Sequence, residues 1–259
     1  TAPTWRPDVT CDADISEEIC RIHGLDNIES HLPCLDVTKG GQHIIYDVQD
    51  SIKDYMVAVG MNEVINYSFI HPSAFDKIGL AADDARRKAI DIMNPITDDF
   101  KVMRTTLVPG MLANVAYNVA RQNTKVATFE VGRIYFADQL PLSGFPTEKP
   151  MLCMALCGKR NELNWNEGRE DVDFYDAKGI VEGLLNNLQL QDWKFTVGSA
   201  PYLHPGKSCS IEYNGMSIGY FGEVHPAVQN AYGLPQAAYL FELEIEPLVA
   251  AATHRFFLG

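Results

Sequence analysis

Four acidic residues near the start of the sequence have a type and a spacing that could bind a cation. Asp14, Glu17 and Glu18 lie at i, i+3 and i+4, so a helix would place them on one side of its first turn, and Asp8 lies in the extended segment just before. Hard cations such as Mg2+ prefer carboxylate oxygens of this kind. A helix dipole also favours acidic residues at its N-terminus. The pattern therefore leaves two interpretations open, a Mg2+ site and a solvated helix start.

The other candidate motifs indicate structure rather than chemistry. Gly206-Lys207-Ser208 is similar to the end of a phosphate-binding loop, but Pro201 stands where that pattern requires glycine, and the following segment is typical of a strand. Cys153 and Cys157 lie four apart in a predicted strand, so we expect them on one face, packed in the core. The sequence contains no Gly-x-Ser-x-Gly nucleophile motif. These patterns do not predict a hydrolase.

The composition is that of a folded protein with an excess of negative charge. The 259 residues are 46% hydrophobic and 21% charged, which excludes intrinsic disorder. Thirty-four acidic and 21 basic residues give a net charge of −13, which opposes general binding to nucleic acid phosphates. No apolar run approaches the roughly 18 residues that span a bilayer, and residues 1–15 lack a signal peptide pattern. Six cysteines without a CxxC pair are typical of reduced thiols, so we expect a cytoplasmic protein.

A short N-terminal unit must position the acidic residues. Isoleucines at helical spacing predict a helix over Ile15–His23, whose start has the spacing of a capping box formed by Asp14 and Glu17. Gly40-Gly41 indicates a linker over Leu35–Gln42. Both ends of the sequence interrupt a pattern, so we expect a fragment of a longer chain.

The rest of the sequence predicts an α+β fold built on an antiparallel sheet. Helices are predicted over Ile44–Gly60, Asp76–Arg87, about Leu112–Val119 and Asp173–Leu188. Strands are predicted over Val64–Phe69, Ile90–Met93, Val126–Phe136, Met151–Leu156, Trp193–Val197, Ser208–Tyr213, Met216–Gly222 and Tyr239–Ile245. Asn214-Gly215 is the clearest hairpin signal. Strands separated by uneven helices favour this class over a regularly alternating α/β fold.

Several segments, in order along the chain, carry a resemblance to one family. They are Trp5–Asp8, Asp12–Ile28, Asn94–Ile96, Val102–Leu112, Phe129–Tyr135, and Leu203–Lys207 together with Gly219–Pro226. In these segments the sequence resembles the β subunit of bacterial phenylalanyl-tRNA synthetases, also called phenylalanine–tRNA ligases. Each motif is modest alone, but together they cover nearly the whole chain.

The resemblance implies two domains and a metal site. Residues 1–36 would be the C-terminal part of a small α/β domain of the B5 type plus a linker. Residues 37–259 would be a core with the class II aminoacyl-tRNA synthetase fold, an antiparallel sheet flanked by helices. The family places Mg2+ ligands at the positions of Asp8, Asp14, Glu17 and Glu18, all of which are acidic here. The ion would be shared with the catalytic α subunit.

The resemblance also implies a function and its partners. The β subunit scaffolds the α subunit in an α2β2 heterotetramer, which uses ATP to attach phenylalanine to tRNA(Phe). ATP and phenylalanine would be bound by the α subunit. Two rival interpretations remain open, a stand-alone Mg2+-dependent enzyme that uses the acidic cluster and a nucleic-acid-binding module, which the net charge opposes.

The core lacks the arginines that the class II reaction requires. Catalytic subunits of this class carry one arginine after a Gly-Arg-aliphatic-aromatic strand, where it binds the phosphate of the aminoacyl-adenylate, and a second in a later glycine-rich motif. Here Phe136 occupies the first position, and Tyr239–Leu243 has neither the glycines nor the arginine. A phenyl ring cannot donate the paired hydrogen bonds that orient a phosphate. We therefore expect no catalytic residue in this chain.

The predicted helix and strand over Ile44–Phe69 resemble the class II interface motif, although its proline is not clearly matched. In the family, such helices of α and β pack together at the subunit junction. We therefore expect part of one apolar stripe to face a partner. That stripe consists of Val48, Ile52, Tyr55, Met56 and Val59.

Overall fold

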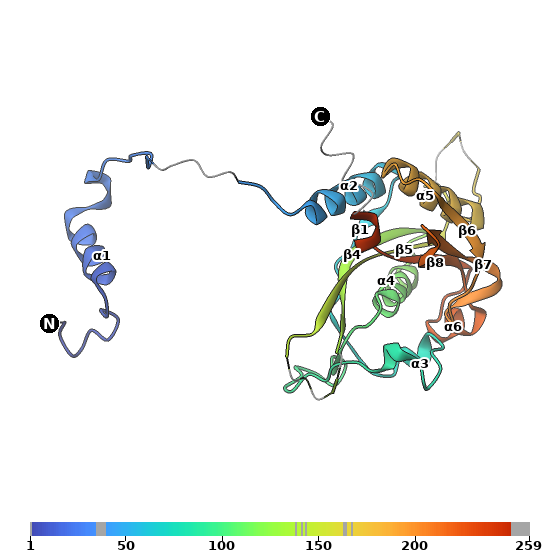
Figure 1. Cartoon of the computed structure of the whole chain (residues 1–259), viewed down its shortest axis with the longest axis horizontal. Helices are drawn as coiled ribbons and strands as arrows, with labels where there is room; N and C mark the ends of the chain where they lie inside the picture. Colours follow the sequence, from blue (N-terminus) through green and yellow to red (C-terminus); the bar gives the residue numbers. More distant parts are fainter. Residues whose placement is uncertain are drawn as a thin grey trace. The chain divides into compact units, whose positions relative to one another are not determined.

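The computed structural model describes residues 2–34, 40–137, 139–140, 142, 144–162, 165–166 and 168–249 (Figure 1). The chain divides into two compact units, Thr1–Gly41 and Gln42–Gly259. Within the described ranges, no helix is both long and apolar enough to cross a membrane.

The first unit contains helix α1 (Asp12–His23) and the short 3-10 helix η1 (Leu25–Asn27). The predicted helix start was wrong by three residues, and Asp14 is not the N-cap. The helix begins at Asp12 after the N-cap Cys11, and Asp14 is its third residue. The Asp14 carboxylate accepts a hydrogen bond from the Cys11 backbone N–H at 2.8 Å, so Asp14 caps the helix from its third position. No residue of α1 is buried, and its isoleucine face is exposed in this unit.

The second unit is built on a seven-stranded sheet in the order β1-β4-β5-β9-β8-β7-β6. All neighbouring strands are antiparallel except β1 and β4, which are parallel. The strands are β1 (Asn62–Glu63), β4 (Lys125–Phe136), β5 (Thr147–Gly158), β6 (Trp193–Val197), β7 (Leu203–Tyr213), β8 (Met216–Val224) and β9 (Ala238–Glu244). A separate two-stranded sheet pairs β2 (Phe69–Ile70) with β3 (Val102–Met103). The predicted mixed α+β architecture with a large, mostly antiparallel sheet is confirmed.

Helices cover both faces of the large sheet (Figure 1). The first core contains residues of α4 (Val108–Ala120), α3 (Ala74–Lys77) and α6 (Pro226–Ala231), and the second those of α2 (Ile44–Ala58) and α5 (Phe174–Asn187). Strand β5 lies between them and is apolar on both faces. Its side chains alternate, so the buried Cys153 and Cys157 pack in the first core, as predicted, and Met154 packs in the second.

The predicted hairpin is present between β7 and β8. Asn214 and Gly215 both have positive φ, at 49° and 77°, which suits the tight turns that match the twist of two antiparallel strands.

The motif Gly206-Lys207-Ser208 lies within strand β7, and no helix follows it. The Lys207 ammonium pairs with the Glu223 carboxylate at 2.7 Å. The phosphate-loop interpretation is therefore excluded by the local fold.

The segment between α2 and α4 differs most from the sequence prediction. The strand predicted over Val64–Phe69 is wrong for residues 64–68, because the chain leaves the sheet edge after the Val64 N–H bonds to the Phe129 carbonyl. The helix predicted over Asp76–Arg87 is replaced by α3 and the 3-10 helix η2 (Ala85–Arg87). Gly79, at a φ of +71°, ends the first turn. The strand predicted over Ile90–Met93 is reduced to a single bridge.

The apolar stripe of α2 belongs mainly to the core of this unit. Val48, Ile52 and Met56 are fully buried, and the Tyr55 hydroxyl donates to the Ile180 carbonyl of α5 at 3.1 Å. Of the five stripe residues, only Val59 is exposed. We expected part of this stripe to face a partner; Val48, Ile52 and Met56 do not, because α5 and the sheet already cover them.

Candidate functional site

The four predicted metal ligands lie at the start of α1, where a basic side chain already contacts two of them. Arg6 Nη2 lies 2.6 Å from Asp8 Oδ2 and 2.5 Å from Glu18 Oε1. The second oxygen of Glu18 lies 2.6 Å from Arg21 Nη2. Asp8 and Glu18 are thus joined through one guanidinium group.

The other two carboxylates are placed differently. Asp14 Oδ2 accepts hydrogen bonds from the backbone N–H groups of Thr10, at 2.6 Å, and Cys11. Glu17 is exposed on the same turn of α1. Among the described residues, no group of three or more His, Cys, Asp or Glu side chains is arranged to hold a metal ion. The structure therefore brings Asp8 and Glu18 together and leaves Asp14 and Glu17 in separate environments.

The electrostatics of this cluster favour ionised carboxylates. The backbone hydrogen bonds from Thr10 and Cys11 lower the pKa of Asp14 to about 2. Hydrogen bonds from Arg6 lower the pKa of Asp8 and of Glu18, and these two carboxylates in turn raise the pKa of the Arg6 guanidinium. Ionised oxygen donors are what a hard cation requires, so the cluster fits Mg2+ in donor type.

A second candidate lies on the large sheet, where the class II arginines are missing. A cavity of about 290 Å³ is lined by Phe136 at the end of β4, Glu242 and Glu244 of β9, and residues of β5 and β8. Lys149 and Arg86 also line it. The strand ends that the resemblance singled out therefore meet at one cavity, and they bring a phenyl ring and carboxylates to it.

Glu242 is the buried polar centre of this cavity. Its Oε1 accepts hydrogen bonds from the Thr106 hydroxyl at 2.8 Å and the Leu107 backbone N–H at 2.7 Å, and its Oε2 lies 3.3 Å from the Tyr202 hydroxyl. Burial raises the pKa of Glu242 and that of Tyr202. The two cations of the lining already face carboxylates, Arg86 with Asp84 at 2.6 Å and Lys149 with Glu244 at 4.0 Å. Glu242 would also repel an anionic phosphate, so the cavity is poorly suited to clamping an adenylate.

A buried ion pair fixes the helix-to-sheet junction beside this cavity. Arg104 Nη1 lies 2.7 Å from Glu130 Oε1, with 6% and 3% of the two side chains exposed. Arg104 Nε donates to the Arg133 carbonyl at 2.9 Å, and the Asn66 amide donates to Glu130 Oε2 at 2.6 Å. A Cβ at Gly132 would lie 2.5 Å from the guanidinium, so only glycine leaves room. Sequence reasoning missed this pair, although a glutamate between Phe129 and Val131 within a predicted strand was a signal for it.

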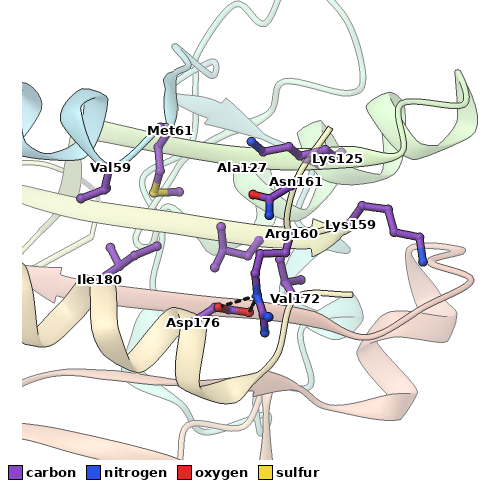
Figure 2. Close-up of a pocket in the computed structure, with 13 residues that line it drawn as sticks. Val59, Met61, Lys125, Ala127, Lys159, Arg160, Asn161, Val172, Asp176 and Ile180 are labelled. Carbon is purple, nitrogen blue, oxygen red and sulfur yellow. Dashed lines mark hydrogen bonds and ion pairs between the residues drawn. The ribbon is translucent and has the colours of Figure 1, made fainter. Parts of the chain in front are cut away.

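A second cavity, shown in Figure 2, lies between the C-terminal end of α2 and the first turns of α5, with a volume of about 270 Å³. Lys125, Lys159 and Arg160 line it, but two of these cations are already paired. Arg160 Nε lies 2.9 Å from Asp176 Oδ1, as drawn in Figure 2, and Lys159 lies 2.7 Å from Asp171. These pairs offset most of the positive charge that an anion would need.

The last candidate is an apolar groove of about 380 Å³ beside α4. Its walls include Phe100, Pro109 and the rings of Tyr67 and Tyr117. The rings of Tyr67 and Phe100 lie 4.9 Å apart, yet 72% of Tyr67 is exposed. Tyrosine and phenylalanine are enriched at protein interfaces, so these exposed rings make the groove a candidate interaction site.

The sequence and the fold are each similar to known proteins. The family described as "Phenylalanyl tRNA synthetase beta chain CLM domain" matches residues 28–245. The phenylalanine–tRNA ligase beta subunit of Syntrophotalea carbinolica is 41% identical over 258 residues, with 97% of this chain and 31% of that protein covered. The corresponding subunit of Geobacter sulfurreducens is 34% identical over 253 residues, with the same shares covered. The chain thus spans less than a third of the length of these curated relatives.

A solved structure supports the fold assignment. Pyrrolysyl-tRNA synthetase from Desulfitobacterium hafniense superposes with a TM-score of 0.60 over 79% of this chain and 68% of that one. The two sequences are 11% identical, so this likeness concerns the fold alone. The neighbour is a tRNA synthetase, so the likeness agrees with the synthetase-like fold expected of the core.

Proposed function

The chain belongs to the phenylalanyl-tRNA synthetase β-chain family, and from this we propose that it forms part of a phenylalanine–tRNA ligase β subunit that scaffolds the catalytic α subunit. The holoenzyme attaches phenylalanine to tRNA(Phe) with ATP, and its α subunits bind the ATP and the phenylalanine. Assembly is an α2β2 heterotetramer in the cytoplasm. The observation that carries the proposal is the family match, which extends over residues 28–245.

A scaffolding role, rather than a catalytic one, is supported by the sheet cavity. By the family resemblance, Phe136 stands where a synthetase that performs the reaction carries an arginine, and Glu242, in the segment that lacks the second arginine, lines the same cavity. Neither a phenyl ring nor a carboxylate with occupied lone pairs stabilises the phosphate charge that develops during amino acid activation. The chemistry is therefore assigned to α, and this chain contributes structure.

The two-unit organisation supports the proposed domains. We assign residues 1–36 to the end of a B5-type domain plus linker, and residues 37–259 to the synthetase-like core. The compact units divide between Gly41 and Gln42, a few residues beyond this boundary.

Mg2+ is the proposed cofactor of the N-terminal unit, with Asp8, Asp14, Glu17 and Glu18 as its ligands from this chain. Their donor type fits, and Asp8 and Glu18 already converge on one cation, Arg6. Because Mg2+ requires near-octahedral oxygen coordination, further oxygens from α and from water would complete the shell. When bound, the ion would offset the negative charge of these side chains at the subunit contact.

The apolar groove beside α4 supports the assembly part of the proposal. It exposes aromatic surface, since 72% of Tyr67 and 57% of Tyr117 is exposed. Interface cores are enriched in tyrosine, phenylalanine and methionine. We assign this groove, instead of the α2 stripe, to contact with α.

Two measurements test the proposed function. The chain should co-purify with a catalytic α subunit after co-expression, and the chain alone should give no phenylalanine-dependent pyrophosphate exchange. Exchange by the chain alone that is lost on mutation of Glu242 would contradict the scaffolding role. The rival interpretations gain no support from the similar proteins, which are phenylalanine–tRNA ligase β subunits, and the net charge of −13 opposes a nucleic-acid-binding module.

A further inference from the structure

The most exposed aromatic ring of the groove beside α4 is carried on a backbone that buried residues hold in place. Tyr67 is 72% exposed, yet both of its chain neighbours bond to buried side chains or backbone. The Asn66 side-chain amide donates to Glu130 Oε2 at 2.6 Å, and the Asn66 carbonyl accepts from Arg104 Nη1 at 3.4 Å. The Ser68 carbonyl accepts from the Arg104 backbone N–H at 2.9 Å. The buried Arg104–Glu130 pair therefore fixes the segment that presents this ring.

A second loop adds another ring and a carboxylate to the same groove. The Phe100 ring lies 4.9 Å from the Tyr67 ring, so the two form one aromatic surface. Asp98 pairs with Lys101 at 2.9 Å, whereas the exposed Asp99 lines the groove. Ring faces and carboxylates both attract cations, so this combination suits a lysine or arginine side chain.

We propose that these two rings and Asp99 bind a lysine or arginine side chain of the α subunit, and that Asn66 is a positioning residue for this contact. The inference rests on the proposed function, in which the groove contacts α. A carboxylate beside the rings repels the phosphates of a nucleic acid, which favours a protein partner. The groove contains an internal example of the same contact, because Lys77 Nζ lies 5.8 Å from the centre of the Tyr232 ring. A ring that is held in place before binding loses little conformational entropy on assembly, and this raises the affinity.

The test measures the affinity of the whole chain for the purified α subunit by biolayer interferometry. Tyr67→Ala should weaken binding by about thirtyfold, a loss typical of an aromatic anchor in an interface. Asp99→Asn should weaken binding by roughly threefold at low salt and by less at high salt, because salt screens an exposed charge. The matched control is Tyr175→Ala, which removes a ring of α5 that is 75% exposed and should leave the affinity unchanged.

A double-variant cycle tests the positioning role of Asn66. Asn66→Ala should weaken binding by roughly fivefold in the wild type and by less than about twofold in the Tyr67→Ala background, because it acts through the ring. The matched control is Asn62→Ala, which removes another amide bond to β4, 3.4 Å to the Ala127 carbonyl, outside the groove. Circular dichroism checks that each variant retains the fold.

Three outcomes would overturn the inference while α still binds. Unchanged affinity of Tyr67→Ala would mean that the rings do not contact α, and unchanged affinity of Asp99→Asn at low salt would mean that no cation binds beside them. Equal effects of Asn66→Ala in both backgrounds would mean that Asn66 stabilises the fold without positioning the ring. If the wild-type chain does not bind α at all, the proposed function itself is contradicted, so the two failures are distinguishable.

Discussion

Replacing Arg104 with methionine should destabilise the second unit by about 3–5 kcal/mol, because it leaves a buried carboxylate without its counter-ion. Glu130 is 3% exposed and would keep only the Asn66 amide among its present hydrogen-bond donors. The substitution also removes the donor to the Arg133 carbonyl. Methionine retains an unbranched side chain, so the lost charge outweighs the lost packing.

Urea unfolding followed by circular dichroism measures this effect. For a slope near 2 kcal/mol/M, the midpoint should fall by roughly 2 M. The matched control is Arg133→Met, which breaks the nearby Arg133–Glu148 pair, 2.8 Å long but with side chains 47% and 43% exposed. Both side chains of that pair are accessible to solvent, so its loss should lower the free energy of unfolding by less than about 1 kcal/mol.

A double variant separates the loss of the ion pair from the cost of leaving one buried charge unpaired. Arg104→Met combined with Glu130→Met removes both charges, so it should be less destabilising than Arg104→Met alone. The reasoning is refuted if Arg104→Met costs no more than Arg133→Met, or if the double variant is as unstable as the sum of the two single changes.

Three further predictions concern other parts of the chain. The pKa of Asp14 is lowered to about 2 in the folded unit, so its hydrogen bond to the Cys11 N–H should be complete above about pH 4 and lost as the pH falls through 2. The chemical shift of the Cys11 amide proton should follow this titration. A midpoint near the ordinary pKa of 3.8 would contradict the capping role of Asp14. Tyr67→Asp should weaken co-purification with α and leave the circular dichroism spectrum unchanged, whereas a variant that loses the fold would show that the groove is part of the core. Burial raises the pKa of Cys153, so this thiol should resist iodoacetamide in the native chain while Cys34 reacts, and equal labelling rates would count against the buried position of β5.

The elements that the sequence predicted well are those with a long regular spacing. The strands predicted over Val126–Phe136 and Met151–Leu156 are rich in apolar residues, and successive side chains pack against the cores on opposite faces of the sheet. The helix predicted over Asp173–Leu188 has apolar residues at helical spacing on one side. In such segments local propensity and burial agree, so the pattern alone suffices. The Asn214-Gly215 turn was predictable for a similar reason, since few residues tolerate a positive φ.

The features that were missed depend on contacts between distant residues. Arg104 and Glu130 are 26 positions apart, and nothing in the spacing of either indicates the other. The conformation of the region between α2 and α4 is determined by its backbone hydrogen bonds to β4, and the β propensity of its residues did not predict it. At the acidic cluster, the sequence pattern could not indicate that Arg6 contacts Asp8 and Glu18 or that the Thr10 backbone contacts Asp14.

The order of the sheet has a consequence for the synthesis of this protein. Strand β9 lies between β5 and β8, although it is the last of the described strands along the chain. During translation, the hairpins β4–β5 and β7–β8 can form early, but each presents an open, apolar edge until residues 238–244 leave the ribosome. The nascent chain is therefore most exposed to aggregation just before its central strand is made, and a ribosome that stalls in this interval would hold two unjoined half-sheets.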